Sequence, residues 1–245
     1  MSTDHYSHIH AEPSGMQRAN VWRMFDRIAP TYDLVNRLLS FGLDIRWRKK
    51  VATHMPAERD MVLLDLATGT GDQVISLTRS GRFTEAVGMD MSAGMLEKGR
   101  EKVAALKMED LISMEEGDAT AMPLEDERFD AVTISFGIRN VVHVDKALAE
   151  MRRVLKPGGR AIILEFSLPE SAVVRAGHLF YLRRILPLVG GLVSGDTDAY
   201  RYLNTTIEAF PYGDAFCKLM TDAGFSTATA HRLTFGIATI YVGVR

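Results

Sequence analysis

Asp65-Leu-Ala-Thr-Gly-Thr-Gly71 decides the fold, because it places two closely spaced glycines between an apolar run and a helical pattern. Glycines at the end of a buried strand let a ligand approach the backbone closely. The next apolar run ends in Glu85-Ala-Val-Gly-Met-Asp90, where the carboxylate of Asp90 can accept hydrogen bonds from both hydroxyls of a ribose. Together the two segments predict a site for a nucleoside.

The loop departs from the fingerprint of a dinucleotide site. That fingerprint needs a third glycine, and Val74 stands at its position. Asp72, at the start of the helix, opposes a bound anion. S-adenosylmethionine has a ribose, an adenine, an ammonium group and a sulfonium but no phosphate, so it is the predicted ligand and a nicotinamide-dependent dehydrogenase is disfavoured. A tight turn explains the glycines alone, but not the three carboxylates Asp65, Asp72 and Asp90.

Short apolar runs alternate with helical patterns along the chain, which is typical of an α/β fold. Five runs have little polar alternation, as strands of a parallel sheet covered on both faces do. They are Val62 to Ala67, Ala86 to Asp90, Leu111 to Met114, Ala131 to Phe136 and Arg160 to Phe166. Ser92 is expected to cap one helix, and Lys156-Pro-Gly-Gly159 to stop another. The fold class is therefore α/β, with a doubly wound, mostly parallel, Rossmann-like sheet.

The C-terminal part adds a helix near residues 212–223 and two strands, which brings the expected sheet to seven strands. The strands, Thr227 to Leu233 and Ile237 to Val244, are expected to form a hairpin that closes the sheet. Two segments lie outside this core: residues 16–55, predicted to be an N-terminal helical lid, and residues 169–210, a helical insertion after the fifth strand. Ligands bind beyond the carboxyl ends of the strands in such sheets, so both segments can cover the site.

Composition limits the class of protein. The 245 residues are expected to form a flexible tail, 1–15, and a single domain, 16–245, and a net charge of -2 gives no general attraction for nucleic acid. The single cysteine, Cys217, excludes internal disulfides and favours the cytoplasm. No apolar run has the ~18 residues of a membrane span, and the tail lacks a signal peptide. No metal site is predicted, because the tail histidines have no ordered frame.

Several motifs resemble the menaquinone/ubiquinone biosynthesis C-methyltransferases of the UbiE type. They are Tyr32-Asp-Leu-Val-Asn36 continuing to Trp47, Asp65 to Asp72, Ile134-Ser-Phe-Gly-Ile-Arg-Asn140, Arg153-Val-Leu-Lys-Pro-Gly-Gly159 with Glu165-Phe166, Tyr200-Arg-Tyr-Leu-Asn204 and Phe210-Pro211. The resemblance covers nearly the whole chain from about residue 20. It implies a class I S-adenosylmethionine-dependent methyltransferase that methylates a ring carbon of a prenylated quinol. Thr68 stands where the family usually has glycine, and Asp44 where it usually has histidine.

Cofactor contacts are implied by the same resemblance. The residues concerned are Thr70, Asp90, Asp118, Ala119 and Ser135. Asp90 would bind the ribose, Asp118 and Ala119 the adenine amine, and Ser135 would close the pocket. The loop itself adds Gly69 and Gly71, which allow close approach of the backbone, and Asp65, which can orient the loop or attract the ammonium group.

The catalytic residues are less defined by the sequence. A ring carbon becomes nucleophilic when a neighbouring hydroxyl loses its proton. Arg139 and Asn140 follow the fourth strand, where the acceptor ring should lie. Arg139 can stabilise the phenolate, hold a water that removes the proton, or simply pair with a carboxylate across the lid. Tyr32 is the third catalytic candidate, and the remaining ones are Asp33, His143 and Tyr200.

The insertion also bears on partners. Val173 to Val193 is apolar with interspersed arginines, and it can line a channel for an isoprenoid tail, rest on the inner face of a membrane, or pack as a lid or in a homodimer. The basic group Arg46, Arg48, Lys49 and Lys50 is expected to be a solvated helix face. The sequence leaves open whether the acceptor is a naphthoquinol, a benzoquinol or both. The main alternative is a methyltransferase of another small lipid or phenol.

Overall fold

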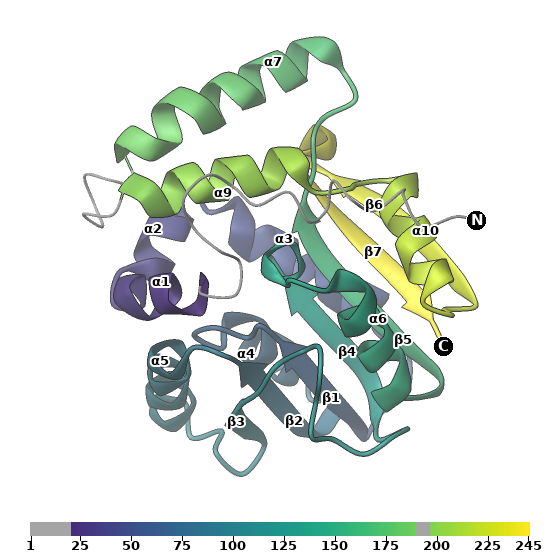
Figure 1. Ribbon diagram of the computed structural model, residues 1–245. Coiled ribbons are helices and arrows are strands. Elements are labelled where there is room, and N and C mark those ends of the chain that lie inside the picture. The colour runs from purple at the N-terminus through teal and green to yellow at the C-terminus, as the bar shows by residue number, and fades with distance from the viewer. Residues whose placement is uncertain (1–20, 190–196) are drawn as a thin grey trace.

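One seven-stranded sheet runs through the molecule, in the order β3-β2-β1-β4-β5-β7-β6. The computed structural model describes residues 21–189 and 197–245 (Figure 1). The strands are β1 (Met61–Leu66), β2 (Phe83–Asp90), β3 (Ile112–Glu116), β4 (Phe129–Ser135), β5 (Leu155–Phe166), β6 (Thr227–Leu233) and β7 (Ala238–Val244). Five pair in parallel, and β7 pairs antiparallel with both β5 and β6. The predicted fold class is confirmed, including the closing hairpin.

The carboxyl ends of the central strands meet at one edge of the sheet. Leu66 of β1 lies opposite Met89 of β2 and Ile134 of β4. The start of β5 differs from the prediction, because β5 begins at Leu155 rather than at Arg160. The pairing register between β4 and β5 shifts there. Leu155 and Arg160 each have a partner in β4, and Lys156-Pro-Gly-Gly159 lies between these two paired residues. The expected turn is thus an irregularity inside a strand.

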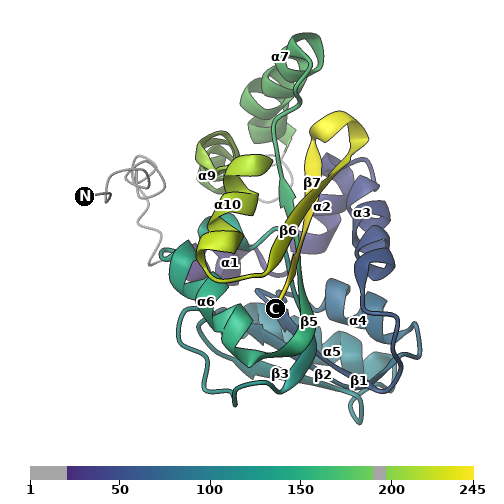
Figure 2. The ribbon, with the colours of Figure 1, turned by 90° about the vertical axis from the view of Figure 1, so that its right-hand side faces the viewer.

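Helices cover both faces of the sheet (Figure 2). One face is covered by α3 (Leu43–Val51), α4 (Asp72–Thr78) and α5 (Ala93–Ala105), whose side chains Trp47, Val74 and Leu96 join one core cluster. The other is covered by α6 (Val144–Val154) and α10 (Asp214–Asp222), through Leu148 and Phe216. Ser92 caps α5 as predicted, since its hydroxyl accepts a hydrogen bond from the Met95 N–H at 3.2 Å.

Five further helical segments form a cap, and four of them share a core of their own. The five are α1 (Val21–Ile28), α2 (Tyr32–Leu39), α7 (Ala172–Phe180), the π-helical turn η4 (Tyr181–Ile185) and α9 (Thr197–Ala209). Met24 of α1, Leu39 of α2, Leu182 of η4 and Ile207 of α9 belong to one buried cluster. The N-terminal helices and the insertion therefore pack on each other, beyond the carboxyl ends of the strands (Figure 1). The predicted tail lies outside the described residues.

None of the helices within residues 21–189 and 197–245 combines the length and apolar character needed to cross a lipid bilayer.

Candidate active site

Two cavities lie between the strand ends and the cap. The first, here called the nucleoside cavity, measures about 390 Å³ and is lined by part of the glycine loop, residues 67–71, and by the ends of β2, β3 and β4. The second, here called the apolar cavity, measures about 340 Å³ and lies under α2, α3, α7 and α9. Four residues line both: Phe25, Tyr32, Phe136 and Asn140. Two ligands could therefore meet across this common wall.

Asp90 is the central carboxylate of the nucleoside cavity. One of its oxygens accepts a hydrogen bond from the Gly69 N–H at 2.8 Å, and the other accepts one from the Ser92 N–H at 2.9 Å. Burial raises the pKa of Asp90, and these backbone bonds oppose the rise. Gly69 has φ of +56°, a conformation that favours glycine. The carboxylate is held in one orientation with acceptor capacity left for a diol.

Asp118, Ala119 and Ser135 line the same cavity, as the resemblance implied. Asp118 accepts hydrogen bonds from the backbone and hydroxyl of Thr120, both at 2.8 Å, which fix the turn after β3. The hydroxyl of Ser135 donates to Gln73 at 3.1 Å. These three residues thus come from two strand ends and meet around one space.

Asp65 acts beneath the loop rather than in the cavity. It is 1% exposed, and its oxygens accept hydrogen bonds from the hydroxyls of Thr68 at 2.7 Å and Thr133 at 2.5 Å. Burial raises its pKa to about 6, even though these two hydrogen bonds lower it. Of the two predicted roles, orienting the loop is the one that this geometry supports. Thr68, the departure from the family pattern, is the residue that makes the contact.

Thr70 lies in a charged cluster at the side of the loop. Its hydroxyl donates to Asp33 at 2.7 Å and accepts from Lys102 at 2.9 Å. Lys102 also pairs with Asp33 and, at 2.7 Å, with Asp72. Thr70 and Gly71 line neither of the two large cavities, so their role as cofactor contacts stays a prediction. The cluster instead connects helix α2 of the cap to the glycine loop.

Asp72 does not repel anions in the way that the sequence predicted. Arg37 contacts its carboxylate at 3.2 Å in addition to Lys102. Although burial opposes the change, the hydrogen bond from Lys102 lowers the pKa of Asp72. The charge is therefore compensated by two cations, and Asp72 is absent from the lining of the nucleoside cavity. The acidic character of that cavity depends on Asp90 and Asp118.

Helix α1 closes the nucleoside cavity from the cap side. Val21, Trp22 and Phe25 contribute to its lining. Asp26 anchors the helix, because its carboxylate accepts hydrogen bonds from the Ser92 hydroxyl at 2.5 Å and the Gly94 N–H at 3.0 Å. This anchor was not predicted from the sequence, because nothing in the spacing of residues indicates a contact between positions so far apart. Aromatic surfaces beside a nucleoside cavity suit a purine base.

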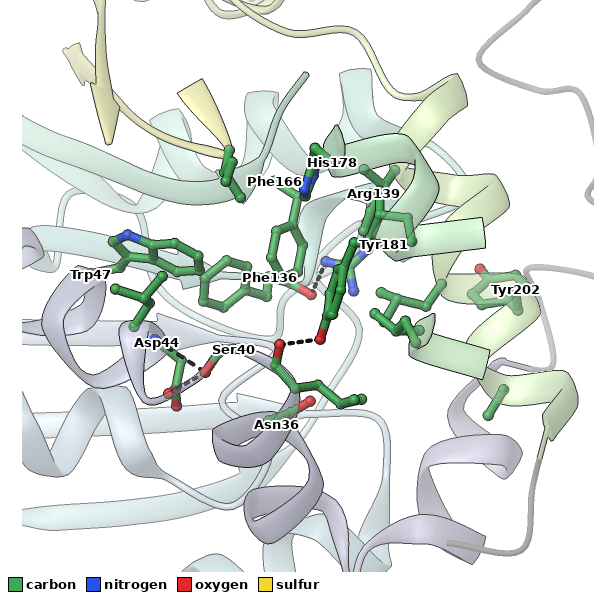
Figure 3. Close-up of a pocket in the computed structure, with 18 of the residues that line it drawn as sticks. Asn36, Ser40, Asp44, Trp47, Phe136, Arg139, Phe166, His178, Tyr181 and Tyr202 are labelled. Atoms are coloured by element: carbon green, nitrogen blue, oxygen red, sulfur yellow. Dashed lines mark hydrogen bonds between the residues drawn. The ribbon is translucent and has the colours of Figure 1, made fainter. Parts of the chain in front are cut away.

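The apolar cavity has a wall of aromatic rings with a few polar groups (Figure 3). Trp47, Phe136 and Phe166 pack on one another, with ring centroids 4.6 to 6.2 Å apart. Arg48 lies over Phe136 at 5.3 Å, so it lines this cavity instead of forming the solvated face predicted for its basic group. Asp44 lines the cavity too, and the Ser40 hydroxyl donates to it at 2.7 Å.

Arg139 is buried at the edge of the apolar cavity and forms an ion pair. Its guanidinium donates to Glu165 of β5 at 2.7 Å and to the Phe136 carbonyl at 2.6 Å, and Nε lacks a partner. Arg139 thus pairs with a carboxylate, but the prediction that this carboxylate lies across the lid is wrong, because Glu165 belongs to the sheet. Next to Arg139, the buried Oδ1 of Asn140 also has no hydrogen-bond partner. Both residues therefore retain hydrogen-bonding capacity toward a ligand.

The other candidates are placed differently. Tyr32 lines both cavities, and burial raises the pKa of its hydroxyl. His143 is exposed at the start of α6 and lines the nucleoside cavity. Asp33 is held by Thr70, and the side chain of Tyr200 lies outside the described residues. His178 of α7, which was not predicted as a site residue, also lines the apolar cavity.

Residues 14–245 match the model of the ubiE/COQ5 methyltransferase family. The chain belongs to that family. It is 49% identical over 222 residues to a ubiquinone/menaquinone biosynthesis C-methyltransferase UbiE of Geobacter sulfurreducens, covering 90% of this chain and 86% of that relative. It is 46% identical over 222 residues to a demethylmenaquinone methyltransferase of Thermus thermophilus, covering 91% of this chain and 100% of the other.

Solved structures share the fold at low sequence identity. An S-adenosylmethionine-dependent methyltransferase of Thermotoga maritima superposes with a TM-score of 0.65 and 19% identity, covering 91% of this chain and 99% of its own. The [4+2]-cyclase SpnF gives a TM-score of 0.63 at 16% identity, covering 95% of this chain and 97% of its own. The shared fold alone thus does not specify the reaction. Family membership does, and it confirms a methyltransferase with S-adenosylmethionine as methyl donor.

The nucleoside cavity fits this donor in charge and shape. Asp90 offers two carboxylate oxygens to a ribose, and Asp118 adds a second acid. Trp22, Phe25 and Met89 supply apolar surface for the adenine. The residues expected to hold the donor are therefore Asp90, Asp118, Ala119 and Ser135, with Gly69 giving access to the backbone.

Replacing Asp90 by Asn tests the placement of the ribose. An amide accepts fewer hydrogen bonds than a carboxylate and carries no charge, and each charge-assisted bond contributes about 1.5 to 3 kcal/mol. We expect the Kd for S-adenosylmethionine, measured by calorimetry, to rise at least tenfold. Glu116→Gln, an exposed acid at the end of β3, is the matched control and should leave Kd unchanged. An unaltered Kd in Asp90→Asn would contradict the placement.

The raised pKa of Asp65 is expected to make the free energy of unfolding depend on pH. Its folded pKa lies above the unfolded value, so the folded state binds more protons and stability falls as pH rises through about 4 to 6. Asp65→Asn removes this loss. The free energy of unfolding of the variant minus that of the original protein should therefore increase by about 1 kcal/mol from about pH 5 to pH 7. Urea titrations at both pH values measure this difference, and the exposed Asp110→Asn should show none.

Proposed function

We propose that this chain transfers a methyl group from S-adenosylmethionine to a ring carbon of a prenylated quinol, as in menaquinone or ubiquinone biosynthesis. The observation that carries the proposal is the common wall of Tyr32, Phe136 and Asn140 between an acidic nucleoside cavity and an apolar cavity. Relatives named for ubiquinone/menaquinone biosynthesis and for demethylmenaquinone support this substrate class.

The apolar cavity suits an aromatic ring with an apolar substituent. When bound, S-adenosylmethionine supplies an electrophilic methyl group on a positively charged sulfur. The protein has to place the acceptor carbon ~3 to 3.5 Å from that methyl group and in line with its bond to sulfur. Phe136 and Phe166, with centroids 4.6 Å apart, offer flat surfaces against which a quinol ring can lie. The tail would then extend between α2, α7 and α9.

Arg139 and Asn140 are proposed to orient the ring hydroxyl. The unpartnered Arg139 Nε can donate to an oxygen that gains negative charge, and the unpartnered Asn140 Oδ1 can accept a hydrogen bond from the hydroxyl before it loses its proton. Tyr32, at the same wall, keeps its proton at neutral pH because burial raises its pKa, so it can act as a further donor. These assignments give each polar group of the wall a role toward one oxygen.

Label transfer tests the function. Purified protein is incubated with methyl-labelled S-adenosylmethionine and, separately, with demethylmenaquinol and with a methoxy-polyprenyl-benzoquinol. Label in one or both quinols identifies the acceptor. Label in neither, with transfer to another phenol or lipid, favours the alternative of a different small acceptor.

Arg139 has to be tested together with Glu165. Removing the arginine alone leaves a buried, unpaired carboxylate, which costs about 3 to 5 kcal/mol of stability. The double variant Arg139→Met, Glu165→Gln avoids this penalty. We expect it to fold and to keep its Kd for S-adenosylmethionine, while kcat for quinol methylation falls at least a hundredfold. Urea unfolding, calorimetry and the label assay measure the three quantities, and unchanged kcat would rule out the proposed role.

We also propose that the mouth of the apolar cavity contacts a membrane surface, which places this cytoplasmic protein where its lipid-like substrate resides. Several apolar side chains on α2, on α7 and in the segments that follow α2 and η4 are exposed, among them Leu38, Phe41, Phe180 and Leu188. Phe41 also lines the cavity, and its ring centroid lies 6.0 Å from that of Tyr181. Apolar side chains next to arginines are typical of interfacial contacts. A homodimer stays a prediction.

The variant Phe41→Asn, Phe180→Ser tests this contact. Phe41 has φ of +52°, which asparagine adopts readily, so the fold should be retained. Loss of these two exposed aromatic side chains, which would be buried in the membrane surface, should weaken binding to vesicles of phosphatidylglycerol and phosphatidylcholine about tenfold or more. Co-sedimentation measures binding. Leu106→Asn, at the end of α5 and far from α7 in both ribbon views, is the control that should bind as before (Figures 1 and 2).

A further inference from the structure

Methylation at carbon requires an acceptor for the proton of the ring hydroxyl. Most ionisable side chains of the apolar cavity are unsuited to this task. The guanidinium groups of Arg48 and Arg139 donate hydrogen bonds but offer no acceptor. Burial raises the pKa of Tyr32 and of Tyr181, and the Tyr181 hydroxyl donates to the Leu39 carbonyl at 2.5 Å. If a side chain of this cavity accepts the proton directly, it therefore has to be one of the remaining groups.

His178 differs from all of these groups. It lies on α7 and lines the apolar cavity, around which Figure 3 draws it together with Phe166 and Arg139. Its Nε2 is buried and has no hydrogen-bond partner. Burial lowers the pKa of the imidazole, so the ring is neutral at pH 7. With the ring proton on Nδ1, Nε2 carries a lone pair that can accept a proton.

We propose that His178 is the catalytic proton acceptor for the ring hydroxyl of the quinol. This inference rests on the proposed function, since it assumes an aromatic hydroxyl in the apolar cavity. A buried nitrogen without a partner is a cost to the folded protein unless a ligand satisfies it. The same cavity holds the unpartnered Arg139 Nε, which can stabilise the oxygen once its proton has left.

The proposed step balances in protons and electrons. The O–H bond breaks, the proton moves to His178 Nε2, and the electron pair stays on oxygen and spreads into the ring. The adjacent ring carbon uses an electron pair to bond the methyl carbon, while the electrons of the methyl–sulfur bond remain on sulfur. The ring carbon then loses its own proton and the oxygen regains one, so that each turnover releases one proton to water.

Other ionisable groups line the same cavity as His178, and their effects on the pH dependence of kcat have to be distinguished from the effect of His178. They are Tyr32 of α2, Asp44 and Arg48 of α3, Arg139 after β4, Tyr181 of η4 and Tyr202 of α9. Asp44 is the main competitor, because it is the carboxylate of this cavity. Burial raises the pKa of Asp65 to about 6, but Asp65 acts on the glycine loop. Saturating S-adenosylmethionine therefore removes its contribution from kcat.

The first test compares kcat for demethylmenaquinol between about pH 5 and pH 9, across the His titration range. We expect His178→Gln to lower kcat about a hundredfold with a similar KM, and to abolish the decrease of kcat at low pH. Imidazole should restore activity to His178→Ala. Asp44→Asn should keep the low-pH decrease, and Ala176→Gln, exposed on the same helix, should match the original protein. Wild-type kcat in His178→Gln, or loss of the decrease in Asp44→Asn instead, overturns the proposal.

A second test does not depend on methyl transfer. 1-Naphthol absorbs differently when ionised, and it can be titrated while bound together with S-adenosylhomocysteine. Its ionisation should occur at higher pH in His178→Gln than in the original protein, whereas the Kd for S-adenosylhomocysteine should not change. Identical titrations overturn the role of His178. If the original protein methylates no quinol at all, the proposed function fails, and this titration still decides whether His178 accepts a proton from an aromatic hydroxyl.

Discussion

The carboxylate of Glu165 holds the segment on which both cavities depend. It is fully buried, and it accepts hydrogen bonds from the Arg139 guanidinium at 2.7 Å and from the Phe166 N–H at 2.8 Å. Through Arg139 it also reaches the Phe136 carbonyl. Phe136 and Asn140, which separate the cavities, are thus fixed by a contact between β5 and the turn after β4. A buried ion pair is a modest source of stability, but it restricts geometry strongly when its remaining hydrogen bonds are made.

The cap is joined to the sheet by polar contacts at two places beside the donor site. Asp33 of α2 contacts Thr70 and Lys102, and Asp26 of α1 contacts Ser92 and Gly94. Each contact combines a carboxylate with several donors, so it is directional as well as attractive. Tyr32 and Phe25 lie on the same two helices and line both cavities. The apolar cavity is thereby coupled to the glycine loop.

The sequence could predict whatever depends on local pattern. Apolar runs without alternation located the strands and placed Asp90 at the end of one of them. Asp118 and Ser135 were implied by the family resemblance, and they lie close to Asp90 because parallel strands end at the same edge. Contacts made by the cap could not be predicted in this way. Asp72 is compensated by Arg37 and Lys102, which lie on other helices. His178 gave no signal, since an isolated histidine within an apolar helix is commonly a packing residue.

The charges of the reaction explain why an apolar cavity suits it. A sulfonium and a phenolate are both charged before methyl transfer, and both are neutral after it. Water stabilises the charged partners more than the transition state, so a cavity that excludes water favours the reaction. Too strong a cation beside the phenolate would reverse this advantage by holding the negative charge on oxygen. Because Glu165 compensates Arg139, the guanidinium can orient the phenolate through Nε without binding it as a free cation would.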